Sequence, residues 1–237
     1  MLRTGGNKIT WLGHASFQIT TPSGNVVLID PWLKGNPKCP PKLQEPPRVD
    51  VILISHGHGD HFGDVLPLAK AHKPKIPAMY ETALWLESKG VQNVQAMSKG
   101  GTVKILDIEA TLVHAFHSNS IEDEGKIIYG GEAAGWIVRL PNGLTVYHAG
   151  DTNVFGDMKL IAEIYKPDVA LLPIGDLFTM GPREASYALR LLGVHHVVPM
   201  HYGTFPALTG TPEALRELTK DIAGLEIHAL KPGESLG

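Results

Sequence analysis

Cysteine and long apolar runs are nearly absent from this sequence. The single cysteine among 237 residues, Cys39, excludes an intrachain disulfide. It lies in a proline-rich segment with no base nearby in sequence, so we expect it to play no catalytic part. No apolar stretch approaches the roughly 18 residues of a membrane span, and the first residues lack the apolar region of a signal peptide. These absences predict a cytoplasmic protein without a membrane span.

A strong charge of one sign is also lacking. The formal net charge is −3, and Lys and Arg are scattered along the chain rather than gathered in a stripe. Nucleic acid is therefore not an expected partner. With 43% hydrophobic and 19% charged residues, the composition is that of a globular protein, and the length suits one large domain. We expect residues 1–237 to form a single domain that acts on a small molecule.

Short runs of alternating or β-branched residues predict strands, and apolar residues at helical spacing predict helices. Strands are expected at residues 8–12, 17–21, 26–29, 50–54, 102–106, 110–116, 135–140, 145–148, 169–172, 195–199 and 225–229. Helices are expected at residues 60–71, 81–88, 155–165, 182–192 and 212–222. Each half of the chain thus has antiparallel strands followed by helix–strand units. This order predicts an α/β (α+β) fold, a four-layer αββα sandwich of two mixed β-sheets with helices outside.

The strongest chemical signal is the segment Ser55-His56-Gly57-His58-Gly59-Asp60-His61, which directly follows a predicted strand. Residues i and i+2 of extended backbone project to the same side, and the glycines let the loop turn toward a second centre. Imidazole and carboxylate donors together suit Zn, Mn or Fe. The segment therefore predicts a metal site on a strand-to-helix loop.

A single histidine is more often structural than a metal ligand, and the chain has 12 of them. Three imidazoles and a carboxylate packed together without a metal would, however, bring partly charged groups into one place at a desolvation cost. We therefore retain the metal interpretation for this segment. We expect no functional role for His72, His195, His196 and His228.

These residues make the chain resemble the metallo-β-lactamase superfamily, whose signature is His-x-His-x-Asp-His after a strand. Nearly from end to end, the chain resembles one branch of this superfamily, an uncharacterised group of metal-dependent hydrolases. That branch is related to the ascorbate-6-phosphate lactonases and, more distantly, to the phospholipase D that cleaves N-acyl phosphatidylethanolamine. The segments that carry the resemblance are residues 13–17, 28–31, 56–64, 115–118, 147–152, 172–175, 178–182 and 199–206. The resemblance implies the metallo-β-lactamase fold, which is the αββα sandwich expected above.

The resemblance also implies two divalent metal ions, with Zn favoured and Mn or Fe as alternatives. The implied ligands are His56, His58 and His117 for one ion, Asp60, His61 and His201 for the other, and Asp151 as the bridge. The residue type supports the bridge, because Asp151 follows a predicted strand and a carboxylate can span two cations. We prefer His117 to His114 because it lies where the strand passes into a loop.

Further residues of these segments are candidates for supporting roles. His14 could touch substrate or orient a ligand, and Asp30 could accept a hydrogen bond from a ligand's ring N–H. A structural role is equally open for both, and for His148. Tyr202 could polarise a substrate carbonyl.

Three other parts of the chain are expected near the pocket. Arg183 could hold an anionic group, although a solvated arginine at a helix start is the commoner case. The stretch of residues 118–131 and the proline-rich loop of residues 34–47 are expected to frame the pocket, and both are candidates for a homo-oligomer interface.

The expected activity is metal-dependent hydrolysis of a small ester, lactone, amide or phosphoester. Two ions about 3.5 to 4 Å apart would share a hydroxide that attacks without a Ser or Cys nucleophile. Asp60, His14 and Tyr202 are the expected catalytic residues, with Asp60 relaying a proton to the leaving group.

Two alternatives remain open, a non-catalytic metal-binding or sensing protein and a nuclease or phosphodiesterase of the same superfamily. All the implied ligand positions are filled, which disfavours a degenerate scaffold, and no basic face supports a nuclease. The superfamily's di-iron oxidoreductases usually have an acidic residue where this chain has His58.

Overall fold

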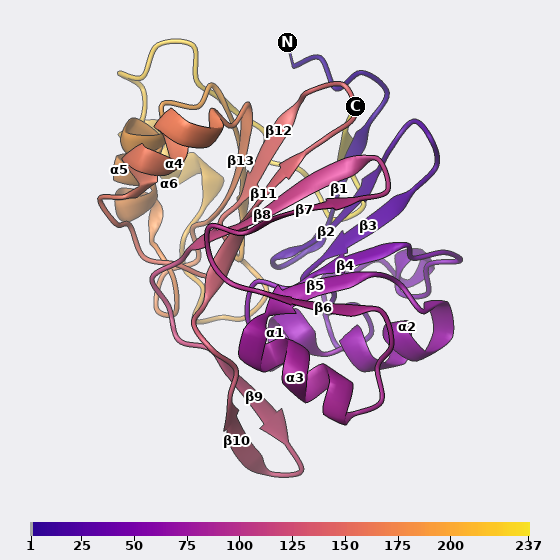
Figure 1. Ribbon diagram of the computed structural model, residues 1–237. Coiled ribbons are helices and arrows are strands. Elements are labelled where there is room, and N and C mark those ends of the chain that lie inside the picture. The colour runs from indigo at the N-terminus through magenta and orange to yellow at the C-terminus, as the bar shows by residue number, and fades with distance from the viewer. Residues whose placement is uncertain (1) are drawn as a thin grey trace.

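Two β-sheets that face each other form the centre of the computed structural model, which describes residues 2–237 (Figure 1). The first sheet has five strands in the order β16-β1-β2-β3-β4, and the second has seven in the order β15-β14-β13-β12-β11-β8-β7. The strands of the first sheet are β1 (Lys8–Gly13), β2 (Ser16–Thr20), β3 (Val26–Ile29), β4 (Val51–Leu53) and β16 (Ser235–Leu236). Those of the second are β7 (Thr102–Ile105), β8 (Ile108–His114), β11 (Ala134–Arg139), β12 (Thr145–His148), β13 (Val169–Pro173), β14 (His196–Met200) and β15 (Glu226–Ile227).

Both sheets are mixed. In the first, β1, β2 and β3 pair antiparallel and β4 joins β3 in parallel. In the second, β8, β11 and β12 pair antiparallel, whereas β12, β13, β14 and β15 run parallel. A parallel two-stranded sheet of β5 (Ile76–Met79) and β6 (Val94–Met97) lies beside β4.

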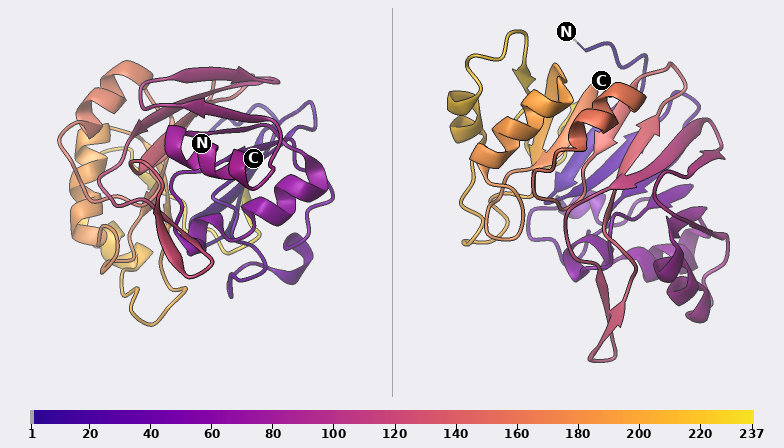
Figure 2. Two further views of the ribbon diagram at one scale, coloured as in Figure 1. Left: turned by 60° about the horizontal axis from the view of Figure 1, so that its bottom comes forward. Right: turned by 60° about the vertical axis from the view of Figure 1, so that its left-hand side comes forward.

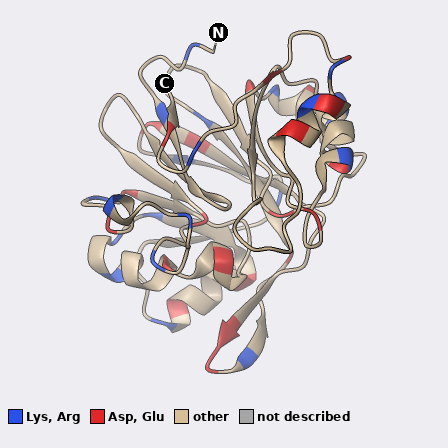
Figure 3. Ribbon diagram, turned by 180° about the vertical axis from the view of Figure 1, so that it is seen from behind, with Lys and Arg blue, Asp and Glu red and all other residues tan. Residues whose placement is uncertain are grey.

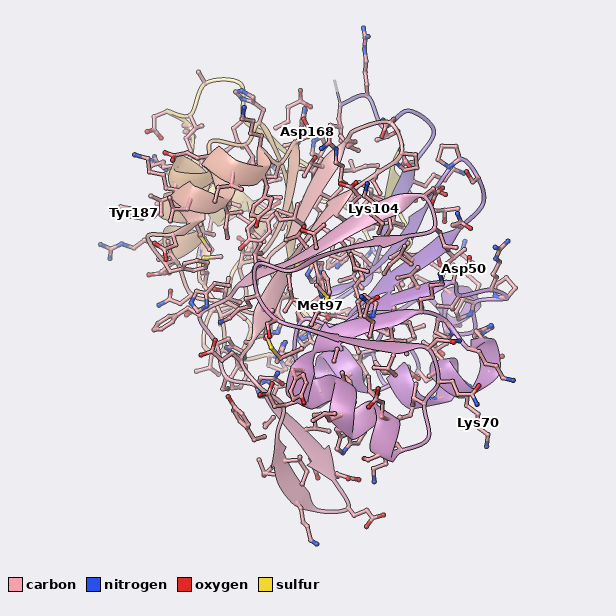
Figure 4. The ribbon with its side chains drawn as sticks, viewed as in Figure 1. Asp50, Lys70, Met97, Lys104, Asp168 and Tyr187 are labelled. Atoms are coloured by element: carbon pink, nitrogen blue, oxygen red, sulfur yellow. The ribbon has the colours of Figure 1, made fainter. Side chains whose placement is uncertain are left out.

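Helices cover the outer face of each sheet, as the two views of Figure 2 show. The helices on the first sheet's side are α1 (Gly59–Phe62), α2 (Val65–His72) and α3 (Tyr80–Ser88), and those on the second's are α4 (Met158–Tyr165), α5 (Pro182–Leu192) and α6 (Pro212–Leu218). In Figure 4, Lys70 on α2 and Tyr187 on α5 project into solvent from opposite sides of the molecule. The predicted four-layer αββα sandwich is confirmed.

Apolar side chains fill three layers. The layer between the sheets contains Phe17 and Leu53 from the first sheet and Trp136 from the second. Strand β13 is buried on both faces, since Leu171 points into this layer and Leu172 toward α4 and α5. A parallel strand covered on both sides reads as a continuous apolar run, which explains why the sequence predicts it correctly.

The helix expected at residues 60–71 is wrong as a single element, because the chain breaks it at Gly63 and Asp64 into α1 and α2. The Asp64 carboxylate accepts the backbone N–H groups of Leu33 at 2.5 Å and Lys34 at 3.1 Å. This contact fixes the start of the proline-rich segment of residues 34–47, which contains a 3₁₀ helix at Pro41–Leu43. The break is therefore a tertiary effect.

Residues 118–131, for which the sequence pattern predicts no strand, contain a hairpin of β9 (Ser120–Asp123) and β10 (Lys126–Tyr129). The hairpin projects from the body at the bottom of Figure 1. Glu124 and Gly125 at its tip both have positive φ, 51° and 75°, which is the backbone of a tight hairpin turn.

Helix length and the distribution of surface charge are two further features of the described residues. No helix within residues 2–237 has the length and apolarity needed to cross a bilayer. Figure 3 shows Lys and Arg dispersed over several elements rather than gathered on one.

Candidate metal centre

Loops that follow strands of both sheets meet at one edge of the sandwich. The residues they carry there are Asp30 after β3, His56 after β4, His117 after β8, Asp151 after β12 and His201 after β14, with His14 in the β1–β2 turn. Because β12, β13 and β14 are parallel, their carboxyl ends lie at the same edge, where open α/β sheets place their ligands.

Hydrogen bonds between the sheets fix this edge. The backbone N–H of His201 donates to the carbonyl of His14 at 2.9 Å. The ring of His148 accepts the N–H of Gly150 at Nδ1, 3.1 Å away, so its Nε2–H donates to the carbonyl of Ala15 at 2.8 Å. His148 is fully buried and therefore positions the turn that carries Asp151.

The predicted ligands form two groups, and within each group the donor atoms all lie within 4.8 Å of one another. One group is His56, His58 and His117, and the other is His14, Asp60, His61 and His201. Asp151 lies between them. Its Oδ1 is 3.2 Å from Nε2 of His61, and its Oδ2 is 3.1 Å from Nε2 of His201 and 3.7 Å from Nε2 of His117. All seven predicted ligands thus converge, and His14 joins them.

Several of these atoms are buried without a partner of hydrogen-bond geometry, namely Nε2 of His56, His61 and His201 and Oδ1 of Asp151. Buried polar atoms are nearly always satisfied, and each unsatisfied one costs about 1–3 kcal/mol. A divalent cation among these nitrogens and the carboxylate would satisfy them together. The donor set therefore fits a metal of the Zn, Mn or Fe type.

The protonation states support cation binding. Burial, followed by the neighbouring His61, holds the pKa of His56 well below its usual value, and burial likewise lowers the pKa of His58 and His117. These rings are neutral at pH 7, the form that binds metals. Burial acts to raise the pKa of Asp151, but His201 and His61 outweigh it and keep this carboxylate ionised.

His61 lies between two carboxylates. Burial acts to lower its pKa, but Asp151 and Asp30 outweigh burial and raise the pKa well above the usual value. The space between these carboxylates thus favours positive charge.

The Asp30 carboxylate orients two of the histidine rings, His61 directly and His56 through Ser55. It accepts from Nδ1 of His61 at 2.8 Å and from the backbone N–H and hydroxyl of Ser55 at 2.7 and 2.5 Å. Since the Ser55 hydroxyl donates to Asp30, it accepts from Nδ1 of His56, 2.9 Å away. Both rings therefore turn Nε2 into the site, and in the neutral ring this is the atom that can bind a metal, an orientation that such carboxylates enforce in metal centres.

Substituting Asp30→Asn is expected to weaken metal binding by about 10- to 100-fold, because the amide disturbs the acceptors that orient His61 and Ser55. Asn tolerates the positive φ of 48° at this position, so the fold should persist. The measurement is a competition titration against a chromophoric chelator. Asp50→Asn, at a carboxylate of the same sheet that binds Val26 and Arg48, is the matched control. Equal affinities in the two variants would contradict the assignment.

His14 is held between Asp60 and Thr204. Its Nε2 is 3.0 Å from Oδ2 of Asp60, and its Nδ1 is 2.9 Å from the Thr204 hydroxyl. A carboxylate only accepts, so Nε2 carries the proton and Nδ1 accepts from Thr204. Burial lowers the pKa of His14 to about 4, so this ring is neutral. Sequence reasoning missed Thr204, although it lies three residues after His201 in a segment of the resemblance.

Two expected residues lie elsewhere. The ring of Tyr202 stacks on Trp11 with centroids 5.4 Å apart and packs against the core. Within residues 2–237 no hydrogen bond, ion pair or ring contact joins its side chain to the two groups. Arg183 is exposed at the start of α5.

His114 is exposed and its Nδ1 lies 2.9 Å from Nζ of Lys99, whereas His117 joins the first group.

A cavity of about 340 Å³ opens onto the centre, a size suited to a small molecule. It is lined by His58, Asp60, His117, Ser118, Asp151 and Phe178. Ser118 belongs to the segment expected to frame the pocket.

The single thiol takes no part in this site. Cys39 is buried in the layer between the first sheet and its helices. Burial, with a contribution from Asp64, raises its pKa to about 11, so it is not a thiolate nucleophile at neutral pH.

Comparison with known proteins gives full-length matches. Residues 8–201 match the β-lactamase superfamily domain. A UPF0173 metal-dependent hydrolase of Koribacter versatilis is 51% identical over 230 residues, covering 97% of both chains, and one of Solibacter usitatus is 54% identical over 227 residues, covering 96% of this chain and 98% of the other. Among solved structures, Igni18, a metallo hydrolase from Ignicoccus hospitalis, matches with a TM-score of 0.86 and 33% identity over 97% of both chains.

Proposed function

Since the chain belongs to the UPF0173 metal-dependent hydrolases of the β-lactamase superfamily, we propose that it hydrolyses a small ester, lactone, amide or phosphoester with two divalent metal ions. The observation that carries this proposal is the convergence of seven candidate ligands around buried donor atoms without hydrogen-bond partners. The small cavity above them supports a small-molecule substrate.

The two groups of side chains suggest how the ions would be held. His56, His58 and His117 would bind one, Asp60, His61 and His201 the other, and Asp151 both. Zn is favoured because imidazole nitrogens predominate, with Mn and Fe as alternatives. When bound, such ions supply a nucleophile from water at neutral pH and stabilise negative charge on a substrate oxygen.

Asp60 is the candidate for proton transfer. It lines the cavity, and although burial acts to raise its pKa, the hydrogen bond with His14 and the nearby His61 together keep the pKa below the usual value. An ionised carboxylate at the cavity wall can take a proton from the nucleophile and deliver it to the leaving group. His14 acts through Asp60, whose Oδ2 it holds, and is therefore a positioning residue.

Phe178 offers the apolar part of the binding surface. Its side chain is 58% exposed at the cavity mouth, where it can cover an apolar substituent of the substrate.

Substituting His14→Asn is expected to lower kcat by about 10- to 100-fold while KM stays unchanged, because Asn is too short to hold Asp60. Asn tolerates the φ of 56° at this position. His14→Gln, whose longer amide N–H can reach Asp60, should restore part of kcat. His72→Asn, at the end of α2, is the control for loss of a distant histidine. Wild-type kcat in His14→Asn would contradict the positioning role.

The proposed function is tested by incubating the metal-loaded protein with aryl esters, lactones, amides and phosphodiesters. We expect turnover of at least one class, absent in Asp151→Ala. Two bound ions with no turnover of any class would favour the non-catalytic alternative, metal binding or sensing.

A further inference from the structure

A second cluster of metal-binding side chains lies on β14 and β15, away from the candidate metal centre. His196, Glu226 and His228 place donor atoms within 4.8 Å of one another. His196 begins β14, whereas His201 follows the end of that strand. At roughly 3.3 Å per residue, about 16 Å of strand separates the two.

The sheet register brings the cluster together. His196 is the parallel partner of Glu226, and His228 lies two residues beyond Glu226, where its N–H donates to the carbonyl of Val197 at 2.8 Å. Side chains alternate between the faces of a strand, so all three project from the same face. Val198 packs between the sheets and Val197 against the helices, so this face is the one that turns toward the first sheet.

The distances suit tetrahedral coordination. Nδ1 of His196 is 3.1 Å from Nε2 of His228, and Oε2 of Glu226 is 3.7 and 3.8 Å from these same two nitrogens. Donors bound tetrahedrally at about 2.0–2.1 Å are roughly 3.3 Å apart. The Glu226 carboxylate lies nearly equidistant from the two nitrogens, as a third donor would.

The environment also suits a cation. The side chains of His196 and His228 are only 15% and 21% exposed, whereas that of Glu226 is 48% exposed. Burial, followed by His196, lowers the pKa of His228, so its ring is neutral at pH 7. Neutral imidazole is the metal-binding form, and the exposed side of the cluster leaves room for water as a further ligand.

We propose that His196, Glu226 and His228 form a peripheral Zn²⁺ site that cross-links the short edge strand β15 to β14. Two imidazoles and one carboxylate suit Zn²⁺, whereas Ca²⁺ and Mg²⁺ require oxygen donors. Strand β15 has only two residues, so a bound cation would add a cross-link to its few backbone hydrogen bonds. The site assigns a role to His196 and His228, for which the sequence indicated none.

The test is a calorimetric titration of Zn²⁺ into protein whose main centre has been saturated and freed of excess metal by gel filtration. The wild type should bind one further equivalent, and its Tm should rise by about 5 to 10 °C at a hundredfold excess over Kd. His228→Gln should lose both effects. Glu226→Gln keeps both rings and alters a side chain that is more exposed than they are. This variant should bind Zn²⁺ at least about tenfold more weakly than the wild type does.

His195→Gln is the matched control, because His195 precedes His196 and lies outside the cluster. It should bind the further equivalent as the wild type does. The proposal is overturned if the wild type takes up no further Zn²⁺, or if His228→Gln and Glu226→Gln bind it with wild-type affinity. Because the readout is a stoichiometry and a Tm, it does not depend on any activity of the main centre.

Discussion

Replacing Asp151 with alanine is expected to reduce the bound metal well below the wild-type content and to lower hydrolysis by more than about 100-fold. Loss of a group that only orients a ligand costs roughly 10- to 100-fold, and a carboxylate shared by two ions should cost more. Asp151 lies within 4 Å of rings of both groups, since it approaches His56, His117, His61 and His201. The measurements are elemental analysis and turnover of the best substrate found.

Two further variants make this result interpretable. Asp151→Asn keeps the side-chain volume but not the charge, so it should also lose activity if the carboxylate is what binds. Asp157→Ala, at an exposed aspartate six residues further along the chain, should behave as the wild type. Full metal content and activity in Asp151→Ala would contradict the proposed bridging role.

Removing the metal is expected to lower Tm by about 8 to 16 °C. A cation at a thousandfold excess over Kd stabilises the native state by about 4 kcal/mol, and for a chain of this length each kcal/mol shifts Tm by roughly 2 to 4 °C. The cause is specific, because the Nε2 atoms of His56, His61 and His201 are buried without hydrogen-bond partners. Differential scanning calorimetry before and after chelation and gel filtration measures the shift.

The control for this shift is Asp151→Ala, whose Tm should respond little to the same chelator. Re-addition of Zn²⁺ should restore the wild-type Tm. A wild-type Tm that stays constant while elemental analysis shows the metal gone would mean that these donor atoms do not hold a stabilising cation.

The sequence predicts the layers of this fold well, because most strands are buried on at least one face. Strand β13 reads as an unbroken apolar run, and the helix at Pro182–Leu192 begins at its proline and ends before Gly193, as predicted. The errors lie where tertiary contacts override local pattern. Asp64 ends α1 by binding backbone N–H groups about thirty residues earlier in the chain, and no local signal indicates this.

Only part of the candidate metal centre could be predicted from the sequence. The density of ligands from His56 to His61 predicts a metal site directly, whereas the convergence of His117, Asp151 and His201 came from the resemblance. Their meeting depends on how two sheets are aligned, which spacing along one chain does not reveal.

Side-chain direction was the least predictable feature. Tyr202 directly follows His201, yet its ring stacks on Trp11 in the core. His196 and His228 were dismissed singly, because their proximity depends on the parallel register of β14 and β15.

The most direct test of the central claim is the metal content of the wild-type chain purified without chelator. The account predicts about two equivalents of Zn, Mn or Fe per chain at the main centre, plus a third of Zn when the peripheral site is also filled, and a loss confined to the third in His228→Gln. No bound metal, together with no uptake on reconstitution, would contradict the two-metal hydrolase and leave only the fold.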